Sequence, residues 1–457
     1  MRTRIIYLPV NKTVKRGGRM RILAVVSLWM LATVEPTAGR TLTLELAIEL
    51  ALANNDDMRL ADQDRLRARE ELREGWSKAL PDIRVTSNYD RNWVLPTFVF
   101  DTPDGQQSFT IGTPNNLTSI VWLQQPIWTS GRVGAAIKAA RAFRDFTSES
   151  YELSRQTVAS QAEVAYYDVL LAESLVDVIG QALGLAIANL DQVQSLRRAG
   201  RVADYDLFRA EVQVSELRPD SIQAAKNLEI ARMALRDVLG IDQEESVELD
   251  GTFRTTSVLP TEDLNAMTTK GIQARPELQQ AIFEVSIREA AVMAQKSELR
   301  PYLDFVASAQ LALQSNDLSF SSDDAQESWV TGVALSIPLF DGFRNRALVN
   351  KARVDRRKAE IRVDQLARQV RLEIRQAWFD AKEASERLVA QRQVVSLAEK
   401  GEGIARSRYG NGFGTQLELL DAQLVLTRSR SGFVQAQRDR AVSLVMLERA
   451  VGLRIED

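Results

Sequence analysis

The sequence offers many carboxylates but lacks the other side chains on which most enzyme chemistry depends. Its 457 residues include 61 Asp and Glu, 58 Lys and Arg, and neither Cys nor His. Their absence excludes disulfides, thiolate nucleophiles, Cys/His zinc sites and triads with a His base. Chemistry by carboxylates alone would need acids that converge in one cleft, as in a secreted carboxylate-dependent hydrolase. Because no acid pair clusters outside a helical surface, we expect no catalytic residue, no metal site and no cofactor.

One pair of acids has a spacing that matters. Glu418 and Asp421 are three residues apart in a segment with helical periodicity, so both lie on one face of a helix. A solvated helical face is the ordinary interpretation of such a pair in a chain with 61 acids. The alternative is a functional carboxylate cluster, which needs other elements, or other chains, to bring more acids to the same place.

The first 39 residues are typical of an export signal. Basic side chains precede or open the apolar run 22–33, and small residues follow it at 37–39. The run is too short to span a membrane as a helix. We therefore predict a signal peptide at 1–39, with Met20 as an alternative initiator, and an exported mature chain. A buried helix start is the other interpretation. No Cys follows the run, so the sequence predicts no lipid anchor on an N-terminal Cys.

Composition narrows the remaining classes. A pI near 5.6 and a net charge of −3 argue against a nucleic-acid-binding surface. With only 23 Gly and 12 Pro, long uninterrupted elements are expected. The mature chain has no second run of eighteen apolar residues, so we expect any membrane crossing to be made by strands.

A tandem repeat organises the chain. Four landmarks recur in the same order. At an offset of 212, Ala165-Tyr-Tyr-Asp168 matches Ala377-Trp-Phe-Asp380, 200–211 matches 412–423, and Pro126 matches Pro338. Pro81 matches Pro301 at an offset of 220. The connection between the two prolines is therefore eight residues longer in the first half than in the second.

This repeat predicts the division of the chain. The first repeat covers 40–240, a linker covers 241–272, and the second repeat covers 273–457. Each repeat should contain a helix, a strand pair, a very long helix, a tip turn and a return helix. In the first repeat these elements are expected at 44–80, about 82–128, 133–198, 199–202 and 203–239. In the second they are expected at 277–299, about 302–340, 344–409, 411–414 and 415–451.

The two long helices must pack along their length. Sixty-six residues make a rod of roughly 100 Å, far longer than an ordinary globular helix. In the second rod an apolar stripe steps by four or three residues, which is typical of a coiled-coil seam with close helix approach. The stripe consists of Leu366, Val370, Ile374, Ala377, Ala381, Ala384 and Leu388.

The strand pairs alternate apolar and polar residues around a polar loop. Ile83, Val85 and Tyr89 share one face, and the same period recurs in 302–311, 121–123 and 333–337. Any half-buried soluble sheet shows this period, so the pattern alone leaves both interpretations open. If the strands span a membrane, four cannot close a barrel. Several chains must then share one: two chains would give eight strands and three would give twelve.

The landmark residues resemble a known family. The junction Pro338-Leu-Phe-Asp-Gly-Phe-Arg344 before a very long helix, and the R-Y-x-x-G-x-x-x-x-x-[DE]-x-x-D-A turn at Arg408–Ala422, are similar to the TolC-like outer-membrane factors of tripartite efflux pumps and type I secretion systems. The resemblance covers essentially the whole mature chain. It implies a mainly α protein with a transmembrane β part, an internal tandem repeat and no enzymatic activity.

The resemblance also implies an assembly and partners. We expect a homotrimer in outer-membrane lipid, with a twelve-stranded β-barrel continued by a coiled-coil α-barrel across the periplasm. A periplasmic adaptor protein and an inner-membrane pump or ABC transporter should dock at the far end. The protein would be an exit duct that opens at its periplasmic tip. The alternative is a non-conducting periplasmic coiled-coil scaffold.

Functional residues carry over by motif position. The tip turns that meet the adaptor correspond to Gly200, Arg201, Val202, Gly412, Phe413 and Gly414. Glu418 and Asp421 match acids at the narrowest part of the entrance, where three chains would supply six carboxylates that attract cations. At the equivalent positions the first half has Asp206 and Arg209, so the halves differ.

Two further sets carry over. Asp206 and Tyr409 match a latch that holds the entrance shut, although Gly414 replaces an Arg of the best-known member and leaves one charged latch in doubt. The helix–strand junctions are expected at Pro81, Pro126, Pro301 and Pro338, because proline suits neither a helix interior nor a strand ladder.

Overall fold

The computed structural model describes residues 40–103, 105–254, 263–321 and 325–452. The predicted signal peptide at 1–39 lies outside these residues. The described helices are α1 (Leu44–Asn54), α2 (Asp56–Ser77), α3 (Arg132–Arg198), α4 (Asp204–Leu239), α5 (Leu264–Ala274), α6 (Pro276–Ser297), α7 (Arg344–Gly410) and α8 (Gln416–Val451). The strands are β1 (Arg40–Leu42), β2 (Asp82–Arg91), β3 (Thr97–Thr102), β4 (Gly105–Thr110), β5 (Asn115–Trp128), β6 (Val247–Leu249), β7 (Tyr302–Ser315) and β8 (Ala325–Ser336).

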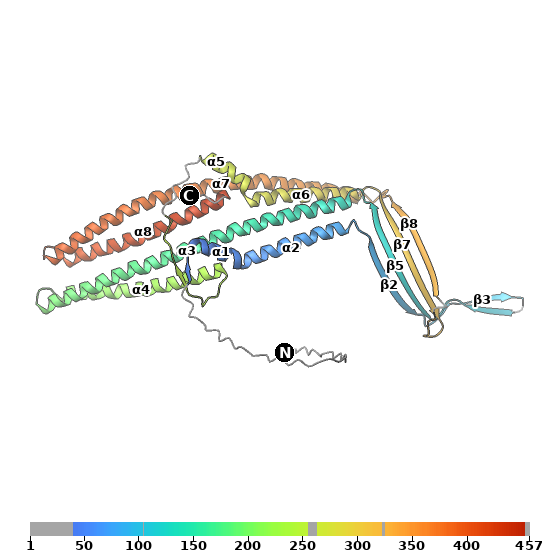
Figure 1. Cartoon of the computed structure of the whole chain (residues 1–457), viewed down its shortest axis with the longest axis horizontal. Helices are drawn as coiled ribbons and strands as arrows, with labels where there is room; N and C mark the ends of the chain where they lie inside the picture. Colours follow the sequence, from blue (N-terminus) through green and yellow to red (C-terminus); the bar gives the residue numbers. More distant parts are fainter. Residues whose placement is uncertain (1–39, 104, 255–262, 322–324, 453–457) are drawn as a thin grey trace, which may run out of the picture. The chain divides into compact units, whose positions relative to one another are not determined.

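Two helical hairpins dominate the fold (Figure 1). The long helices α3 and α7 have 67 residues each, and the return helices α4 and α8 have 36 each. Helix α4 packs on α3, α8 packs on α7, and α3 packs on α8, so the hairpins lie side by side in the order α4, α3, α8, α7. Helices α2 and α6 pack against the other halves of the long helices, next to the strands.

The expected single helix at 44–80 is wrong, because the chain breaks at Asn55. There the backbone has φ −59° and ψ 136°, and the side-chain oxygen accepts a hydrogen bond from the amide of Asp57 at 2.9 Å. The side-chain nitrogen donates to the carbonyl of Val238 at 2.9 Å. Asn55 therefore caps α2 and ties the break to α4, an arrangement that Asn favours over a helix interior.

The stripe predicted on the second rod is buried over most of its length. Val370, Ile374, Ala381 and Leu388 are between 0 and 7% exposed. Ala377 and Ala384 are also buried, and Leu366 packs at the edge of the same cluster. Small residues in this seam permit the close helix approach that its Ala content indicated.

Helix α3 is more apolar than we expected from the sequence. Of the described helices it alone includes an eighteen-residue window apolar enough to cross a membrane by length and composition, and 22% of that window is buried inside the chain. A helix at the centre of a packed layer passes the same test. Helix α3 contacts α1, α2, α4, α6 and α8, which places it inside the helical layer.

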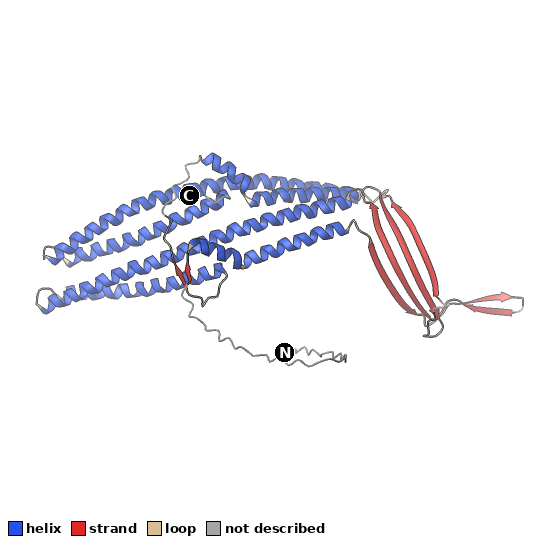
Figure 2. Ribbon diagram, in the orientation of Figure 1, coloured by secondary structure: helices blue, strands red, loops and turns tan. Residues whose placement is uncertain are grey.

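The main sheet has the antiparallel order β2-β5-β7-β8 (Figure 2). The connection between β2 and β5, predicted as a polar loop, contains the β3–β4 hairpin. This hairpin lies in the connection that is longer in the first repeat. Its cross-strand pairs include Phe98 with Phe109 and Thr97 with Thr110, and alternating aromatic and Thr residues of this kind favour strands.

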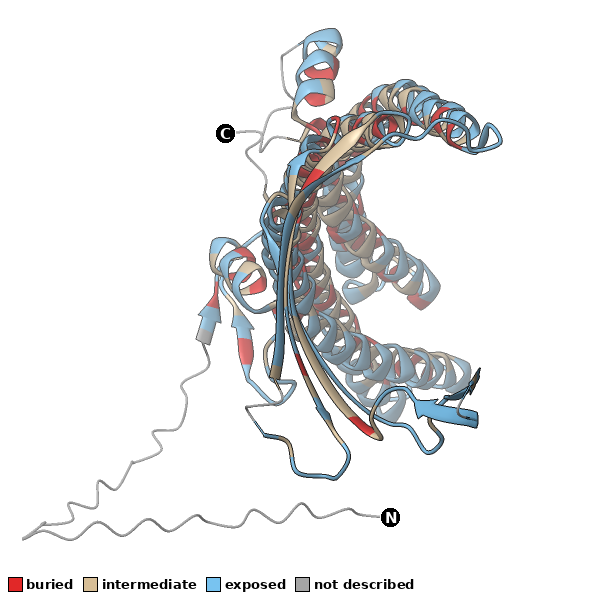
Figure 3. Ribbon diagram, turned by 90° about the vertical axis from the view of Figure 1, so that its right-hand side faces the viewer, coloured by how far each residue is buried: buried red, intermediate tan, exposed pale blue. Residues whose placement is uncertain are grey.

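The register of the main sheet gathers most of its apolar residues on one face. Ile83 lies opposite Leu123, Leu123 opposite Ala307, and Leu303 opposite Leu335. Odd-numbered residues therefore share a face in all four strands, and the even-numbered face contains Asp, Asn, Gln and Ser side chains. The apolar face is uncovered within the chain: Ile83 is 62% exposed and Leu335 is 59% exposed. Figure 3 shows the strands mostly as exposed or intermediate.

A cluster of buried residues surrounds Tyr166 and Tyr167 on α3. Each is 1% exposed, and the cluster includes Leu235 and Leu239 of α4. The Tyr166 hydroxyl donates to the carbonyl of Leu42 in β1 at 3.3 Å. Gly251, just beyond β6, allows this contact, because a Cβ there would lie 2.4 Å from the Tyr166 hydroxyl oxygen.

Candidate functional site at the helical turns

Both hairpins reverse through the same hydrogen-bonded motif. At the end of α3, Gly200 has φ +69°, its amide bonds the carbonyl of Arg197, and the amide of Arg201 bonds the carbonyl of Leu196. At the end of α7, Gly412 has φ +78° and its amide donates to the carbonyl of Tyr409. The amide of Phe413 donates to the carbonyl of Arg408. These are Schellman caps, in which glycine takes the left-handed position at low cost.

The first turn is closed by one ion pair and a small apolar cluster. The Arg197 guanidinium lies 2.5 Å from the Asp204 carboxylate, which joins the end of α3 to the start of α4. Val202 packs against Val193, Leu207 and Ala210. The predicted tip residues Gly200 and Arg201 are exposed.

In the second turn, little space is left around Gly414. A Cβ at Gly414 would lie 3.1 Å from the Arg408 Cβ and 3.2 Å from Glu418 Oε2. The Arg408 guanidinium donates to the Phe413 carbonyl at 3.2 Å and lies 3.9 Å from the Glu418 carboxylate. Phe413 is 80% exposed at the tip. An arginine at position 414 would therefore have to displace the Arg408 side chain or Glu418.

Glu418 and Asp421 lie on the exposed side of α8, as their spacing predicted. The opposite side of the helix, with Gln416, Leu419 and Gln423, is buried. Glu418 follows the N-cap Thr415, whose hydroxyl accepts a hydrogen bond from the Glu418 amide at 3.2 Å. Asp421 has no ion-pair partner within 4 Å among the residues that the structure describes, whereas Glu418 has Arg408.

The two hairpins are joined at their tips by a bond that the sequence did not suggest. The Gln416 side-chain amide on α8 donates to the backbone carbonyl of Asp206 on α4 at 3.0 Å. The expected latch residue Tyr409 has a buried hydroxyl without a hydrogen-bond partner among the described residues. Burial and then the charge of Asp206 raise the pKa of Tyr409.

An apolar groove of about 610 Å³ runs between α4 and α8, close to the turns. Tyr205, Phe208 and Val212 form one wall and are between 55 and 67% exposed. Asp421 and Arg209 also line it. Sequence reasoning missed this groove, although the spacing of Tyr205, Phe208 and Val212 by three and four residues already marks an apolar helical face.

At the other end, the helix–strand junctions bend through left-handed residues as well as prolines. Ser130 and Gly131 have φ +52° and +94°, and Gly342 and Phe343 have φ +66° and +65°. These pairs occupy equivalent positions of the two repeats, 212 residues apart. Sequence reasoning assigned the bends to the prolines alone and missed these residues, for which only the glycines gave a signal.

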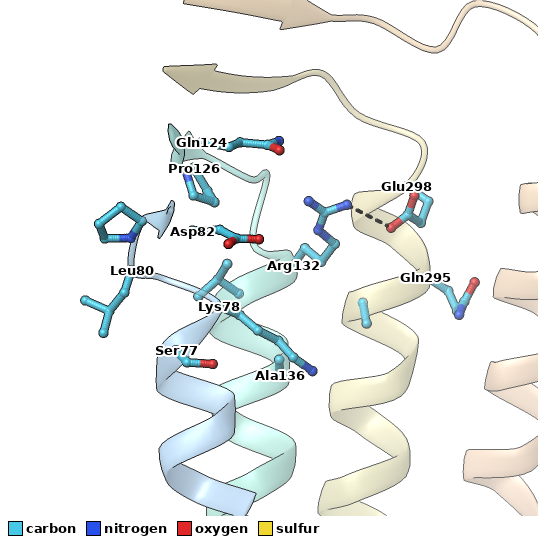
Figure 4. Close-up of a pocket in the computed structure, with 13 residues that line it drawn as sticks. Ser77, Lys78, Leu80, Asp82, Gln124, Pro126, Arg132, Ala136, Gln295 and Glu298 are labelled. Carbon is cyan, nitrogen blue, oxygen red and sulfur yellow. Dashed lines mark ion pairs between the residues drawn. The ribbon is translucent and has the colours of Figure 1, made fainter. Parts of the chain in front are cut away.

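The four prolines lie close to these junctions. Pro126 lies near the end of β5, where the pairing with β7 becomes irregular, and the carbonyl of Pro301 accepts a hydrogen bond from Ser130 at 2.5 Å. Pro338 lies between β8 and α7. Pro81 and Pro126 line a hollow of about 810 Å³, in which Arg132 lies 3.6 Å from Glu298 (Figure 4).

Taken together, the two long helical hairpins, the four-stranded amphipathic sheet and the glycine-capped turns define the architecture of an outer-membrane channel protein. The chain matches the outer membrane efflux protein family over residues 47–241 and 270–453. It belongs to this family, and its location is therefore the outer membrane.

Relatives across most of the chain agree with this assignment. The cobalt-zinc-cadmium resistance protein CzcC of Cupriavidus metallidurans is 22% identical, over 91% of this chain and 91% of that protein. The outer membrane protein TolC of Escherichia coli is 24% identical, over 88% and 80%. The solved structure of the Campylobacter jejuni outer membrane channel CmeC has the same fold, with a TM-score of 0.77, 19% identity, and coverage of 91% and 87%.

Proposed function

We propose that three copies of this chain close into a single exit duct, with a twelve-stranded β-barrel in the outer membrane and a coiled-coil α-barrel below it. The observation that carries this proposal is that both layers of the chain end in open edges. The sheet ends in β2 on one side and β8 on the other, and the helical layer ends in α4 and α7.

Open sheet edges are incompatible with lipid. The backbone groups on the outer sides of β2 and β8 have no strand partner within the described chain, and lipid offers none. Pairing β2 of one copy with β8 of the next satisfies both edges. The interface is head-to-tail, and an interface of this kind forms a ring when the rotation between neighbouring copies closes, which we propose happens after three copies. The uncovered apolar face of the sheet then faces lipid, and the polar face lines the lumen.

The helical edges also present apolar surface for a neighbouring copy. On α7 the exposed apolar residues Val354, Ile361, Leu372, Phe379, Val389, Leu397 and Ile404 are each between 51 and 68% exposed. Several are seven residues apart, which is the repeat of a coiled-coil seam. On α4, Ile222, Ile230 and Met233 are each more than 50% exposed. Neighbouring copies that join α4 to α7 would cover both sets.

In this duct the turns form the periplasmic entrance. Glu418 and Asp421 of three copies form a ring of six carboxylates that favours cations. The entrance is held by contacts between the hairpins, such as the bond from Gln416 to the Asp206 carbonyl. The latch pair Asp206 and Tyr409 would bond only in a tip arrangement different from the present one, in which the Tyr409 hydroxyl has no hydrogen-bond partner among the described residues. A periplasmic adaptor docks on the turns at 200–202 and 412–414, and an inner-membrane pump or ABC transporter supplies the energy. In this proposal the partners select the substrate.

The test is electrical. The purified trimer in planar bilayers under a KCl gradient should show a cation-selective reversal potential. Replacing Glu418 and Asp421 together with Ala should move that potential toward the unselective value, because both carboxylates are lost from each chain. If the double variant forms a conducting trimer with an unchanged reversal potential, the carboxylate ring does not determine ion selectivity.

A non-conducting periplasmic scaffold is the competing function, and its support is the helical seam alone. It predicts a protein that stays soluble after osmotic release of the periplasm. The channel predicts heat-modifiable oligomers in the outer-membrane fraction. A soluble monomer would overturn the proposed duct together with its barrel.

A further inference from the structure

We infer that Arg408 sets the charge of the entrance by compensating Glu418, so that cation selectivity rests on Asp421. This inference rests on the proposed function, since it assumes that the carboxylate pair of α8 faces the conduction path. The two acids were equivalent in sequence, both on one exposed helical face. Their surroundings in the structure are not equivalent.

The Arg408 guanidinium is held at its place by the turn itself. It donates to the Phe413 carbonyl at 3.2 Å, and the same turn sets the Glu418 carboxylate 3.9 Å away. Gly414 makes room for this arrangement, because a Cβ there would lie 3.1 Å from the Arg408 Cβ and 3.2 Å from Glu418 Oε2. The glycine therefore couples the two charged side chains across the turn.

The pair of Arg408 and Glu418 affects the electrostatic potential at the entrance, but contributes little to the stability of the fold. Arg408 is 55% exposed and Glu418 is 48% exposed, and exposed pairs of this kind hold a fold together only weakly. A fixed positive charge beside a carboxylate nevertheless cancels most of its attraction for a passing ion. In contrast, Asp421 has no ion-pair partner within 4 Å among the described residues, although Arg209 lines the same groove.

The experiment compares single substitutions in the full trimer, using reversal potentials in a KCl gradient. Replacing Arg408 with Gln should increase the ratio of potassium to chloride permeability by about twofold, because Glu418 is then uncompensated. R408K should behave like the unmodified protein, which separates the charge from the shape of the side chain. D421N should reduce selectivity, and E418Q should reduce it as well, because Arg408 is then an uncompensated positive charge at the entrance.

Arg198 provides the matched control. It lies in the last turn of α3, as Arg408 lies in the last turns of α7, and has no ion-pair partner among the described residues. R198Q removes the same charge per chain and should leave the permeability ratio unchanged. In the double variant R408Q/E418Q the ratio should return to that of the unmodified protein. Retention of heat-modifiable trimers shows that each variant is assembled.

The outcomes separate the inference from the duct. An R408Q trimer with unchanged selectivity, beside a D421N trimer with reduced selectivity, overturns the role of Arg408 and leaves the carboxylate entrance intact. An equal effect of R198Q and R408Q also overturns it, since the tip charge as a whole would then be responsible. If neither D421N nor the E418Q/D421N double variant changes selectivity, the proposed role of the carboxylates at the entrance is overturned, and the inference about Arg408 is overturned with it.

Discussion

The side-chain amide of Gln416 donates to the backbone carbonyl of Asp206 at 3.0 Å and so connects the tips of the two helical hairpins. Gln416 is 5% exposed, which shields the bond from water. Its partner is a backbone atom, so the bond depends on the relative position of α8 and α4 and on no second side chain. In a duct whose entrance opens by separating hairpins, this bond must break.

We predict that replacing Gln416 with Ala loosens the closed entrance. Losing one buried hydrogen bond costs about 1 kcal/mol, which corresponds to about a fivefold shift of a closed–open equilibrium. Single-channel recording should show more frequent or larger openings. Gln435 is a suitable control, because its side chain bonds Asp439 on the same helix and connects no hairpins. A Q416A trimer that opens no more often than Q435A would show that this bond does not restrain the entrance.

Replacing Gly251 with Ala should destabilise the centre of the helical layer. The added Cβ would meet the Tyr166 hydroxyl oxygen at 2.4 Å, and Tyr166 is too buried to move aside freely. We expect a loss of about 1–3 kcal/mol, the usual cost of overpacking. The measurement is thermal unfolding followed by circular dichroism. Tyr166→Phe removes the clashing atom, so the double variant should regain part of the loss.

Gly180 is the matched control for this substitution, since a Cβ there meets nothing within 4 Å. It lies inside α3, where Gly→Ala ordinarily stabilises a helix by about 1 kcal/mol. If G251A unfolds at the same temperature as G180A, the close approach of Gly251 to Tyr166 does not limit the stability of the helical layer.

Tyr166 should also make stability depend on alkaline pH. Burial, and then the charges of Asp250, Glu45 and Glu173, raises its pKa from 10.0 to about 12. Because the folded-state pKa lies above the unfolded one, this contribution to stability is complete below pH 10. It is lost as the pH rises from 10 through 12. Unfolding midpoints across this range should fall more steeply for the unmodified protein than for Y166F. If the unfolding midpoints of the unmodified protein and of Y166F fall equally steeply with pH, the prediction is wrong.

The ion pair of Arg438 and Asp168 should contribute measurably to the contact between α8 and α3. The guanidinium lies 2.7 Å from the carboxylate, and the Arg438 side chain is 25% exposed. Arg438→Met should cost about 1 kcal/mol, the upper range for a partly exposed pair. Arg67→Met should cost close to nothing, because Arg67 is 73% exposed and pairs with Glu71 on its own helix. Equal unfolding midpoints for the two variants would rule out the expected difference.

Several features follow from local sequence because they have a short period. The seam through Ile374 and Ala381 repeats every three or four residues, and helical geometry alone places such residues on one face. The same holds for Glu418 and Asp421 on the outside of α8. Alternation in the strands likewise determines which residues share a face, since successive side chains of a strand point to opposite sides.

Other features required the tertiary structure, because they depend on contacts between segments far apart in the chain. Asn55 breaks the first helix partly through its bond to Val238, 183 residues away. The registers between strands, which collect most of the apolar residues of both repeats on one face, are set by pairing across the sheet. No short-range pattern in the sequence contains either piece of information.

The sequence by itself therefore determined the long helices, the repeat, the glycines of the turns and the exposed pair of acids. Only the tertiary structure decided how those two acids differ. Chain reversal over Gly414 brings the Arg408 charge to 3.9 Å from Glu418, whereas Asp421, one turn further along α8, stays beyond ion-pair distance of any described cation. The physical reason is that electrostatic compensation depends on distance in space, and a tight turn changes that distance without changing the residues.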